Sequence, residues 1–345
     1  MKIIINGKFL SQRITGVQRY AREILCELDK ICTNLSVELV APQNVEFPNF
    51  NNIKCVNYGK RSGTLWEQLD FAKYVRKSKG ISLNLCNSAP LFCKKIVVIH
   101  DVKVKVHPEY FSKKFALWYK ILFNNATKKA RHIITVSQFS KSEIIKHYKV
   151  LEDKISVIYN AWQHYLKVEE NNGALDKYSL NANDYFFAMC SLEPNKNLNW
   201  ILNVAKNNSN CNFAVAGGFN KSVFSDNSYD IPSNVRLIGY VNDDDAKYLL
   251  KNCKAFLFPT FYEGFGIPPI EALVAGANKL VVTDSEVMHE VLGDAPIYIN
   301  PNKYDYNLNE LISDSKPILN AEEILNKYSW KKSAQELYKL LIKLS

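Results

Sequence analysis

Long hydrophobic runs are absent from this sequence of 345 residues. No apolar stretch approaches the roughly 20 residues that a membrane-spanning helix needs, and the apolar part of the first seven residues is too short for a signal peptide. We therefore expect a soluble or peripheral protein, in the cytoplasm or at the inner face of the cytoplasmic membrane. Because a domain typically has about 150 residues, the length predicts two domains, each with its own core.

Ordered cysteine patterns and familiar enzyme motifs are also absent. The eight cysteines include no C-x-x-C pair and no close Cys/His cluster, which argues against zinc sites and a disulfide framework and predicts reduced, mostly buried thiols. The sequence lacks G-x-G-x-x-G after the first apolar run, H-E-x-x-H and G-x-S-x-G. Residues 217–222 faintly resemble a phosphate loop but have no glycine directly before Lys221, so we expect a turn there.

Acidic residues are fewer than basic ones. The chain has 34 Asp and Glu against 44 Lys and Arg, a net charge of +10, which favours an anionic partner such as nucleic acid, anionic lipid or a phosphorylated substrate. The basic residues are spread along the chain and form no recognised nucleic-acid module. We therefore expect no nucleic-acid partner, and a basic nucleic-acid-binding protein is only the alternative from another class.

Short β-rich apolar runs alternate with segments of helical period, a pattern typical of an α/β protein with parallel sheets. In the first half the predicted strands are 2–5, 37–41, 81–85, 96–99, 133–136 and 155–158. In the second half they are 185–190, 212–216, 235–237, 255–258, 279–283 and 297–299. Helices are predicted at 16–28 and 140–148 and near 201, 247, 273 and 288. The repeated cycle indicates two similar halves.

A polar stretch without a strong period separates these halves, and it predicts a linker at 166–183 between domains 1–165 and 184–328. The last segment, 329–345, has apolar residues at spacings of three or four and predicts an amphipathic helix with Ser329 as N-cap. The pattern alone allows this helix to pack on either half.

The segment 258–276 is the strongest local signal. A buried strand ends at Pro259, a loop with two glycines follows, and Pro268 and Pro269 are suited to a helix start, which would place Glu271 in the first turn. Outward-pointing amides and the positive end of the helix dipole would hold an oxyanion or a sugar diphosphate there, while Glu263 and Glu271 would accept from hydroxyls. The structural alternative is a helix whose acid merely complements its own dipole.

Glu263 and Glu271, with seven residues between them, resemble the E-x7-E signature of retaining, nucleotide-sugar-dependent glycosyltransferases of family four. The similarity extends along nearly the whole chain. It includes the segments 6–10, 15–20, 100–101, 107–109, 136–141, 191–197, 239–241 and 293–295. The resemblance implies a GT-B fold, in which two Rossmann-like domains face each other across a cleft. The first domain would bind the acceptor, the second the nucleotide sugar, and 329–345 would cross back to the first.

The same resemblance implies the reaction. A hexose such as mannose or rhamnose would pass, with retention, from a nucleoside-diphosphate sugar to a hydroxyl of a growing, polyprenyl-diphosphate-linked surface polysaccharide, an O-antigen or a capsule. It implies no metal and no cofactor apart from the donor. The alternative within the enzyme class is a GT-B enzyme acting on a soluble acceptor, such as a disaccharide synthase. The sequence leaves open the base, sugar, linkage, route to retention and oligomeric state.

Residue roles follow by position in the family motifs. Lys196 would contact the diphosphate, next to Asn195, where many relatives have Arg. His100 would reach the sugar at the floor of the cleft, although a core histidine bonded to backbone is its structural alternative. The residues with implied catalytic roles are Glu263, His100 and Lys196. Those with implied donor-binding roles are Gly16, Ser191, Lys196, Tyr240, Gly264, Phe265, Gly266 and Glu271.

One further segment, 111–131, mixes aromatic and basic residues at helical spacing. Its aromatic side chains would suit the headgroup level of an anionic membrane and its lysines the lipid phosphates. An ordinary helix with an apolar face in the core and a solvated basic face explains the pattern equally well.

Overall fold

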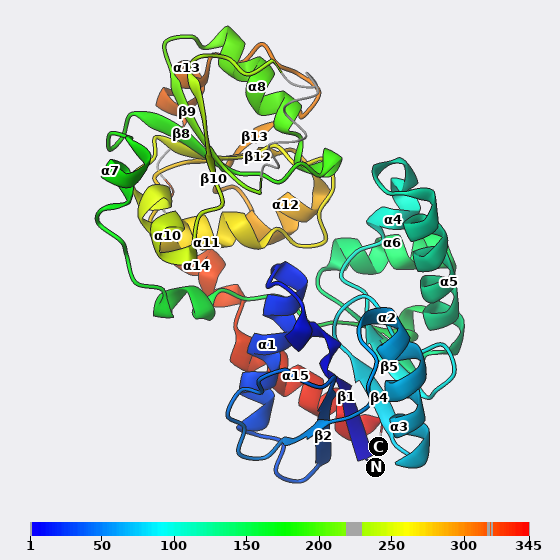
Figure 1. Ribbon diagram of the computed structural model, residues 1–345. Helices are drawn as coiled ribbons and strands as arrows, with labels where there is room; N and C mark the ends of the chain where they lie inside the picture. The colour runs from blue at the N-terminus through cyan, green and yellow to red at the C-terminus, as the bar shows by residue number, and fades with distance from the viewer. Residues whose placement is uncertain (1, 219–229, 316–317, 319, 345) are drawn as a thin grey trace. The chain divides into compact units, whose positions relative to one another are not determined.

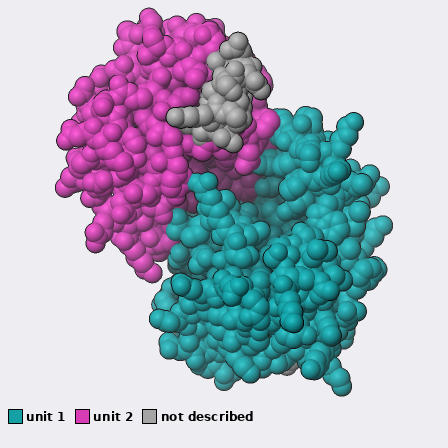
Figure 2. Space-filling model, in the orientation of Figure 1, with its two compact units in different colours: residues 1–161, 328–345 teal, residues 162–327 magenta. Residues whose placement is uncertain are grey.

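The computed structural model describes residues 2–218, 230–315, 318 and 320–344. The chain forms two compact units, shown in separate colours in Figure 2. Unit 1 comprises Met1–Ala161 and Tyr328–Ser345, and unit 2 comprises Trp162–Lys327. Much of the turn expected at 217–222 lies outside the described residues.

Unit 1 is built on a seven-stranded parallel sheet with the strand order β3-β2-β1-β4-β5-β6-β7 (Figure 1). Its strands are β1 (Lys2–Asn6), β2 (Ser36–Ala41), β3 (Lys54–Asn57), β4 (Ile81–Asn84), β5 (Lys95–Val98), β6 (His132–Thr135) and β7 (Ile155–Val157). The isoleucines of β1 are fully buried, because helices cover both faces of a parallel sheet. The strand order reverses between β1 and β4, which makes this position the topological switch point of unit 1.

The helices of unit 1 surround this sheet. They are α1 (Gly16–Asp29), α2 (Gly63–Leu65), α3 (Ala72–Lys77), α4 (Lys103–Val106), α5 (Lys113–Lys129), α6 (Gln138–Tyr148) and α15 (Trp330–Lys343), with a π-helical segment η2 (Trp66–Phe71) and short 3₁₀ turns η1 (Gly7–Ser11), η3 (Pro108–Tyr110) and η4 (Glu152–Lys154). α15 lies beside α1 (Figure 1), and the rings of Tyr20 and Trp330 meet edge to face at 5.9 Å. The predicted N-cap is confirmed, since Ser329 Oγ accepts from Lys332 N at 3.4 Å.

Unit 2 has a six-stranded parallel sheet with the order β10-β9-β8-β11-β12-β13. Its strands are β8 (Tyr185–Met189), β9 (Asn212–Ala216), β10 (Val235–Gly239), β11 (Ala255–Phe258), β12 (Leu280–Thr283) and β13 (Ile297–Ile299). Its described helices are α7 (Ala174–Tyr178), α8 (Leu198–Asn207), α10 (Asp243–Lys251), α11 (Ile267–Ala275), α12 (Glu286–Leu292), α13 (Leu308–Ser313) and α14 (Ala321–Lys327), with 3₁₀ turns η5 (Gln163–Lys167) and η6 (Pro194–Lys196). The strand order reverses between β8 and β11, the switch point of this unit.

The predicted α/β class with two parallel-sheet units is confirmed, and each predicted strand lies within two residues of an observed one. One strand, β3, was not predicted, because it is short and only half-buried at the edge of its sheet. The stretch 166–183, predicted as the linker, lies in unit 2 and includes α7. There Asp245, whose side chain is fully buried, accepts from Asn171, Lys177 and Tyr178 at 2.5–2.9 Å.

The eight cysteines are free thiols, as predicted, and four of them are buried. Cys26 is exposed, and the other three are partly covered. Among the described residues, no helix has the length and apolar character needed to span a membrane.

The packing of α15 generates a prediction that two neighbouring side chains test. Leu341 is fully buried, whereas Ile342 is 48% exposed. We expect Leu341→Ala to lower the free energy of unfolding by about 2–5 kcal/mol, because it leaves a cavity in the core of unit 1. Ile342→Ala should cost less than about 1 kcal/mol. Urea unfolding followed by circular dichroism measures both, and equal losses would contradict the placement of α15.

Candidate functional site

The candidate site of unit 2 lies at the carboxyl ends of β8 and β11. These strands pair in parallel, with Phe187 opposite Phe256, so the loops that follow them emerge at the same edge of the sheet. Because the strand order reverses there, the helices that follow the two strands lie on opposite faces of the sheet. The loop after β8 carries Lys196, and the loop after β11 carries Glu263.

Two asparagines that sequence reasoning assigned no role join these loops. Asn195 is 1% exposed; its carbonyl accepts from Phe261 N at 2.8 Å. Asn197 Nδ2 donates to the carbonyls of Pro259 and Pro301, both at 3.0 Å, and its Oδ1 caps α8. Asn197 also has a φ of 55°, a left-handed conformation that asparagine tolerates better than most residues. The sequence offered one signal for this role, the position of Asn197 directly before a predicted helix.

Lys196 and Glu263 form an ion pair between the two loops. Lys196 Nζ lies 2.8 Å from Glu263 Oε1, and the side chains are 22% and 17% exposed. The ammonium also lies 5.6 Å from the centre of the Phe258 ring. Burial by itself lowers the pKa of Lys196, but the Glu263 carboxylate outweighs it and raises that pKa above its ordinary value. The structure therefore brings two predicted catalytic residues together and keeps the lysine cationic.

The helix after this loop begins one residue earlier than predicted. α11 starts at Ile267, after Gly266, whose φ of 86° suits glycine. Pro268 is the second helical residue, where the missing N–H breaks no helical bond. The prediction that Glu271 lies in the first turn is wrong, because the earlier start puts it in the second turn. Side chains tilt toward the N-terminus of a helix, so Glu271 still leans toward the loop.

Glu271 has a partner that the sequence did not reveal. His164 Nε2, on η5, lies 2.9 Å from Glu271 Oε1, and the side chains are 2% and 15% exposed. Sequence reasoning gave His164 only a structural role, because nothing local marks it. The contact joins positions 107 residues apart, and it positions the carboxylate predicted to bind ribose.

The other donor-binding residues predicted in unit 2 lie at the same edge of the sheet. Ser191 follows β8, and its Oγ accepts from Glu193 N at 3.5 Å. Tyr240 follows β10 and is 65% exposed. Gly264 and Phe265 belong to the loop before α11, where the Phe265 side chain is 3% exposed. Their roles toward a donor stay predictions.

Two predicted site residues belong to unit 1. Gly16 is the exposed first residue of α1, and its φ is not in the left-handed region. His100 follows β5 and is 5% exposed; its Nε2 lies 2.8 Å from the Leu85 carbonyl, and its ring meets Tyr20 edge to face at 4.9 Å. Burial lowers the pKa of His100 to about 4, so the ring is neutral at pH 7. Since a carbonyl only accepts, Nε2 carries the proton and Nδ1 is an acceptor.

Sequence reasoning missed a buried polar cluster at the switch point of unit 1. The carboxylate of Glu67, which is 0% exposed, lies 2.7 Å from Lys8 Nζ and accepts from Ser88 Oγ at 2.7 Å and Asn6 Nδ2 at 2.8 Å. Glu67 stands on the π-helical segment η2, and such segments are frequent at functional sites. The available signal in the sequence was a glutamate directly after the apolar residues Leu65 and Trp66.

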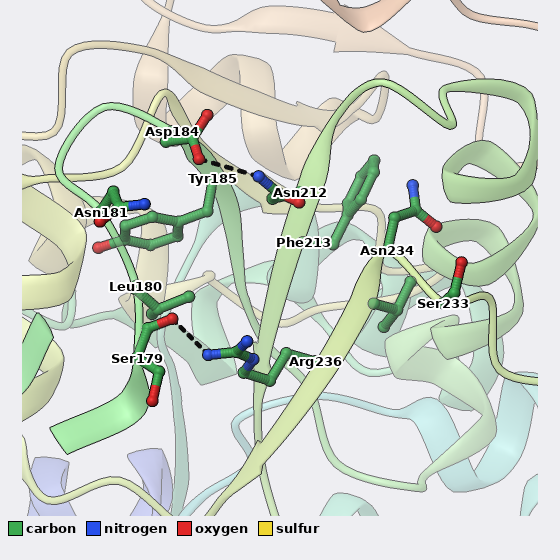
Figure 3. Close-up of a pocket in the computed structure, with 11 residues that line it drawn as sticks. Ser179, Leu180, Asn181, Asp184, Tyr185, Asn212, Phe213, Ser233, Asn234 and Arg236 are labelled. Atoms are coloured by element: carbon green, nitrogen blue, oxygen red, sulfur yellow. Dashed lines mark hydrogen bonds between the residues drawn. The ribbon is translucent and has the colours of Figure 1, made fainter. Parts of the chain in front are cut away.

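A polar pocket of about 270 Å³ lies at the opposite edge of the unit 2 sheet, at the amino ends of β8, β9 and β10 (Figure 3). Two hydrogen bonds join residues of its lining: Asn212 Nδ2 donates to Asp184 at 2.9 Å, and Arg236 donates to the carbonyl of Ser179. This edge lies away from the switch-point loops.

Within the described part of the chain, no group of three or more His, Cys, Asp or Glu side chains is arranged to hold a metal ion.

Two family models match the chain. The model described as Glycosyltransferase Family 4 matches residues 14–162, and the model described as Glycosyl transferases group 1 matches residues 176–328. Together they cover most of the sequence, so the chain belongs to the group 1, family 4 glycosyltransferases.

Two curated proteins similar to this chain are named O-antigen chain mannosyltransferases. The chain is 30% identical to the O-antigen chain mannosyltransferase RfbU of Salmonella typhimurium over 63% of its own length and 59% of RfbU. It is 24% identical to the O-antigen chain mannosyltransferase B of Escherichia coli, over 88% of each protein. The match to RfbU thus spans less than two thirds of that relative.

Solved structures with the same fold include known glycosyltransferases. The sucrose-phosphate synthase of Thermosynechococcus elongatus matches with a TM-score of 0.76 at 12% identity, over 100% of this chain and 99% of that one. HepE of Anabaena, solved with UDP and glucose, matches with a TM-score of 0.70 at 16% identity, over 99% of this chain and 100% of that one. WaaG matches with a TM-score of 0.66 at 13% identity, over 98% of this chain and 95% of that one. These likenesses show the GT-B fold.

The partial burial of the Lys196–Glu263 pair predicts a stronger coupling than that of a surface pair of equal length. Lys206 Nζ and Asp230 Oδ2 are also 2.8 Å apart, but their side chains are 44% and 84% exposed. We expect a double-mutant cycle of Lys196→Met and Glu263→Gln to give a coupling energy of about 2 kcal/mol, measured from the free energies of unfolding. The cycle of Lys206→Met and Asp230→Asn should give less than about 1 kcal/mol. Urea unfolding measures both, and equal couplings would refute the expectation.

Proposed function

We propose that the chain is a retaining, metal-independent glycosyltransferase that moves a hexose, mannose or a similar sugar, from a nucleoside-diphosphate sugar to a hydroxyl of a growing surface polysaccharide. The acceptor in this proposal is a polyprenyl-diphosphate-linked glycan. The observation that carries the proposal is the Lys196–Glu263 pair between the loops of a switch point, directly before the N-terminus of α11.

The geometry of unit 2 supports donor binding there. A sugar nucleotide has a diphosphate, which a cation and a helix N-terminus stabilise, and hydroxyls, which carboxylates accept. The candidate site offers these groups on neighbouring elements: Lys196 before α8, Glu263 before α11, and Glu271 on α11. We assign the diphosphate to Lys196, the transferred sugar to Glu263, and the ribose hydroxyls to Glu271.

Charge development explains the role of the lysine. As the acceptor hydroxyl displaces the nucleoside diphosphate, the leaving group gains negative charge, and a nearby fixed cation lowers the barrier. The raised pKa of Lys196 keeps its ammonium protonated, so its positive charge is present before the donor arrives. Glu263, which shares that ammonium, is placed to accept a hydroxyl of the sugar beside the diphosphate.

The comparisons support the choice of sugar and pathway. Both relatives described above are named O-antigen chain mannosyltransferases, which supports a mannose donor and a bacterial surface polysaccharide. HepE was solved with UDP and glucose, which supports a nucleoside-diphosphate sugar as the donor.

Binding and turnover measurements with a panel of UDP-, GDP- and dTDP-sugars test this function. We expect saturable binding of one donor. Glu271→Ala should weaken that binding about 10-fold, because a hydrogen bond to a charged group contributes about 1.5–3 kcal/mol. Lys196→Ala should lower kcat about 100-fold, through the loss of transition-state charge stabilisation.

Lys206→Ala and Glu322→Ala serve as controls, since both residues are exposed charges of unit 2 outside the site. Circular dichroism verifies that every variant is folded. If all four variants keep the kinetics of the parent protein, the site assignment is wrong, and if no donor binds, the proposed function is wrong.

We further propose that α5 of unit 1 contacts an anionic membrane, where a lipid-linked acceptor would be found. Between positions 103 and 131 the sequence has eight basic residues and one acidic residue. Leu117 and Ile121 of α5 are 59% and 44% exposed. A mainly apolar cavity of about 230 Å³ lies beside them, bordered by Lys105 and Lys120, which join no ion pair among the described residues. Exposed apolar side chains beside unpaired lysines match a surface of anionic lipid.

Sedimentation with vesicles tests this contact. We expect the protein to bind vesicles that contain phosphatidylglycerol and not vesicles of phosphatidylcholine alone. The double variant Lys113→Glu, Lys114→Glu should lose at least about 10-fold in affinity, because each lysine near such a surface contributes about 1 kcal/mol. Lys73→Glu with Lys77→Glu, the matched change on α3, should have little effect, and a similar loss in both variants would contradict a specific role for α5.

A further inference from the structure

Unit 1 contains a larger cavity that none of the predicted site residues lines. Its volume is about 670 Å³, within the range of about 300–1,000 Å³ typical of small-molecule sites. Its walls are the segments 10–12, 42–46 and 60–62, which follow the carboxyl ends of β1, β2 and β3, together with Arg22 of α1. Ligands of parallel α/β sheets bind beyond the carboxyl ends of the strands, so the cavity lies where a ligand is expected.

The lining of this cavity is rich in neutral hydrogen-bonding side chains. Five of them are hydroxyls or amides that both donate and accept: Ser11, Gln12, Gln43, Asn44 and Ser62. Such groups match the hydroxyls of a saccharide, which also donate and accept. The walls offer few large apolar side chains for an alkyl chain or an aromatic ring.

Arg22 gives the cavity a cation with an unmet hydrogen bond. The side chain is half-buried, and its Nε is buried without an acceptor among the described residues. A buried donor without a partner costs about 1–3 kcal/mol, and more when the group is charged. An anionic oxygen in the cavity would neutralise the guanidinium, because Arg22 lines the cavity and its side chain is half-buried.

A second cation, Lys60, stands on a turn that the fold holds in place. Gly59 has a φ of 85°, and the Asp70 carboxylate accepts from Arg61 N at 3.0 Å and from Arg61 Nη1 at 2.6 Å. Burial alone would raise the pKa of Asp70, but these donors hold it below its ordinary value, so the carboxylate stays charged and the turn stays fixed. Lys60 itself is exposed and joins no ion pair in the described part of the chain.

We propose that this cavity binds an acidic saccharide. The anionic group, a carboxylate or a phosphate, lies between Arg22 and Lys60, and the ring hydroxyls bond to the amide and hydroxyl side chains. The exposed Glu46 is the single acid of the lining and accepts from a hydroxyl at the rim. Identification of this ligand as part of the acceptor rests on the proposed function, whereas its binding to unit 1 does not.

Saturation-transfer NMR on the purified full chain tests the proposal with small probes. D-glucuronic acid carries the carboxylate, mannose 6-phosphate carries the phosphate, and D-glucose and D-mannose are the matched neutral sugars. We expect at least one acidic probe to bind about 10-fold more tightly than its neutral counterpart, and the better of the two identifies the anionic group. Inorganic phosphate, the probe without a ring, should bind more weakly than mannose 6-phosphate.

Two variants locate the binding. Arg22→Gln and Lys60→Gln should each weaken the acidic probe about 10-fold and leave the neutral sugars unchanged. Arg76→Gln, a change of an exposed arginine on α3 outside the cavity, is the matched control and should leave binding intact. Because Lys60 is exposed, its variant is informative even if Arg22→Gln lowers stability.

Equal binding of acidic and neutral sugars, no binding of any sugar, or acidic binding that both variants retain would each overturn the proposal. Inorganic phosphate that binds as well as mannose 6-phosphate would overturn the saccharide assignment. The donor panel on the same protein separates this outcome from the proposed function. Acidic saccharide binding without donor binding refutes only the proposed function, and donor binding without acidic saccharide binding refutes only this inference.

Discussion

The parallel pairing of β8 with β11 is the constraint on which the site of unit 2 depends. Lys196 and Glu263 are 67 residues apart in the chain, and they meet because these two strands end at the same edge of one sheet. The reversal of strand order there sends the following helices to opposite faces of the sheet. Asn195 and Asn197, on either side of Lys196, form hydrogen bonds with the loop that carries Glu263 and so fix the two loops to each other.

Such a pair is poorly explained by stability alone. Two partly buried charges lose hydration, and their mutual attraction often does no more than offset that loss. At this switch point the pair keeps a cation and a carboxylate within hydrogen-bond distance of each other, next to the N-terminus of α11. Unit 1 also has a buried pair at its switch point, since Lys8 follows β1 and Glu67, on η2, accepts from Asn6 at the end of β1. Each unit thus places opposite charges at the point where its own sheet reverses.

Local patterns were sufficient for most of the fold. The buried parallel strands have apolar, β-branched runs, and the amphipathic α15 has a period that its sequence shows directly. The short, half-buried edge strand β3 (Lys54–Asn57) lacks such an apolar run and was missed for this reason. The start of α11 was predicted one residue too late, because Pro268 is a strong start signal and the preceding Ile267 is not. Glu271 was therefore assigned to the first turn and not to the second. Polar composition alone suggested a linker where α7 packs in unit 2 near Asp245.

The sequence by itself determined the alternation of strands and helices, the two α/β halves and the residue types able to bind a sugar nucleotide, because these are properties of short segments. Only the tertiary structure decided that His164 meets Glu271, that Lys196 meets Glu263, and that Arg22 and Lys60 line the same cavity. Strand order and side-chain burial create those contacts between distant positions. No local pattern encodes them, since each arises from how separate segments pack.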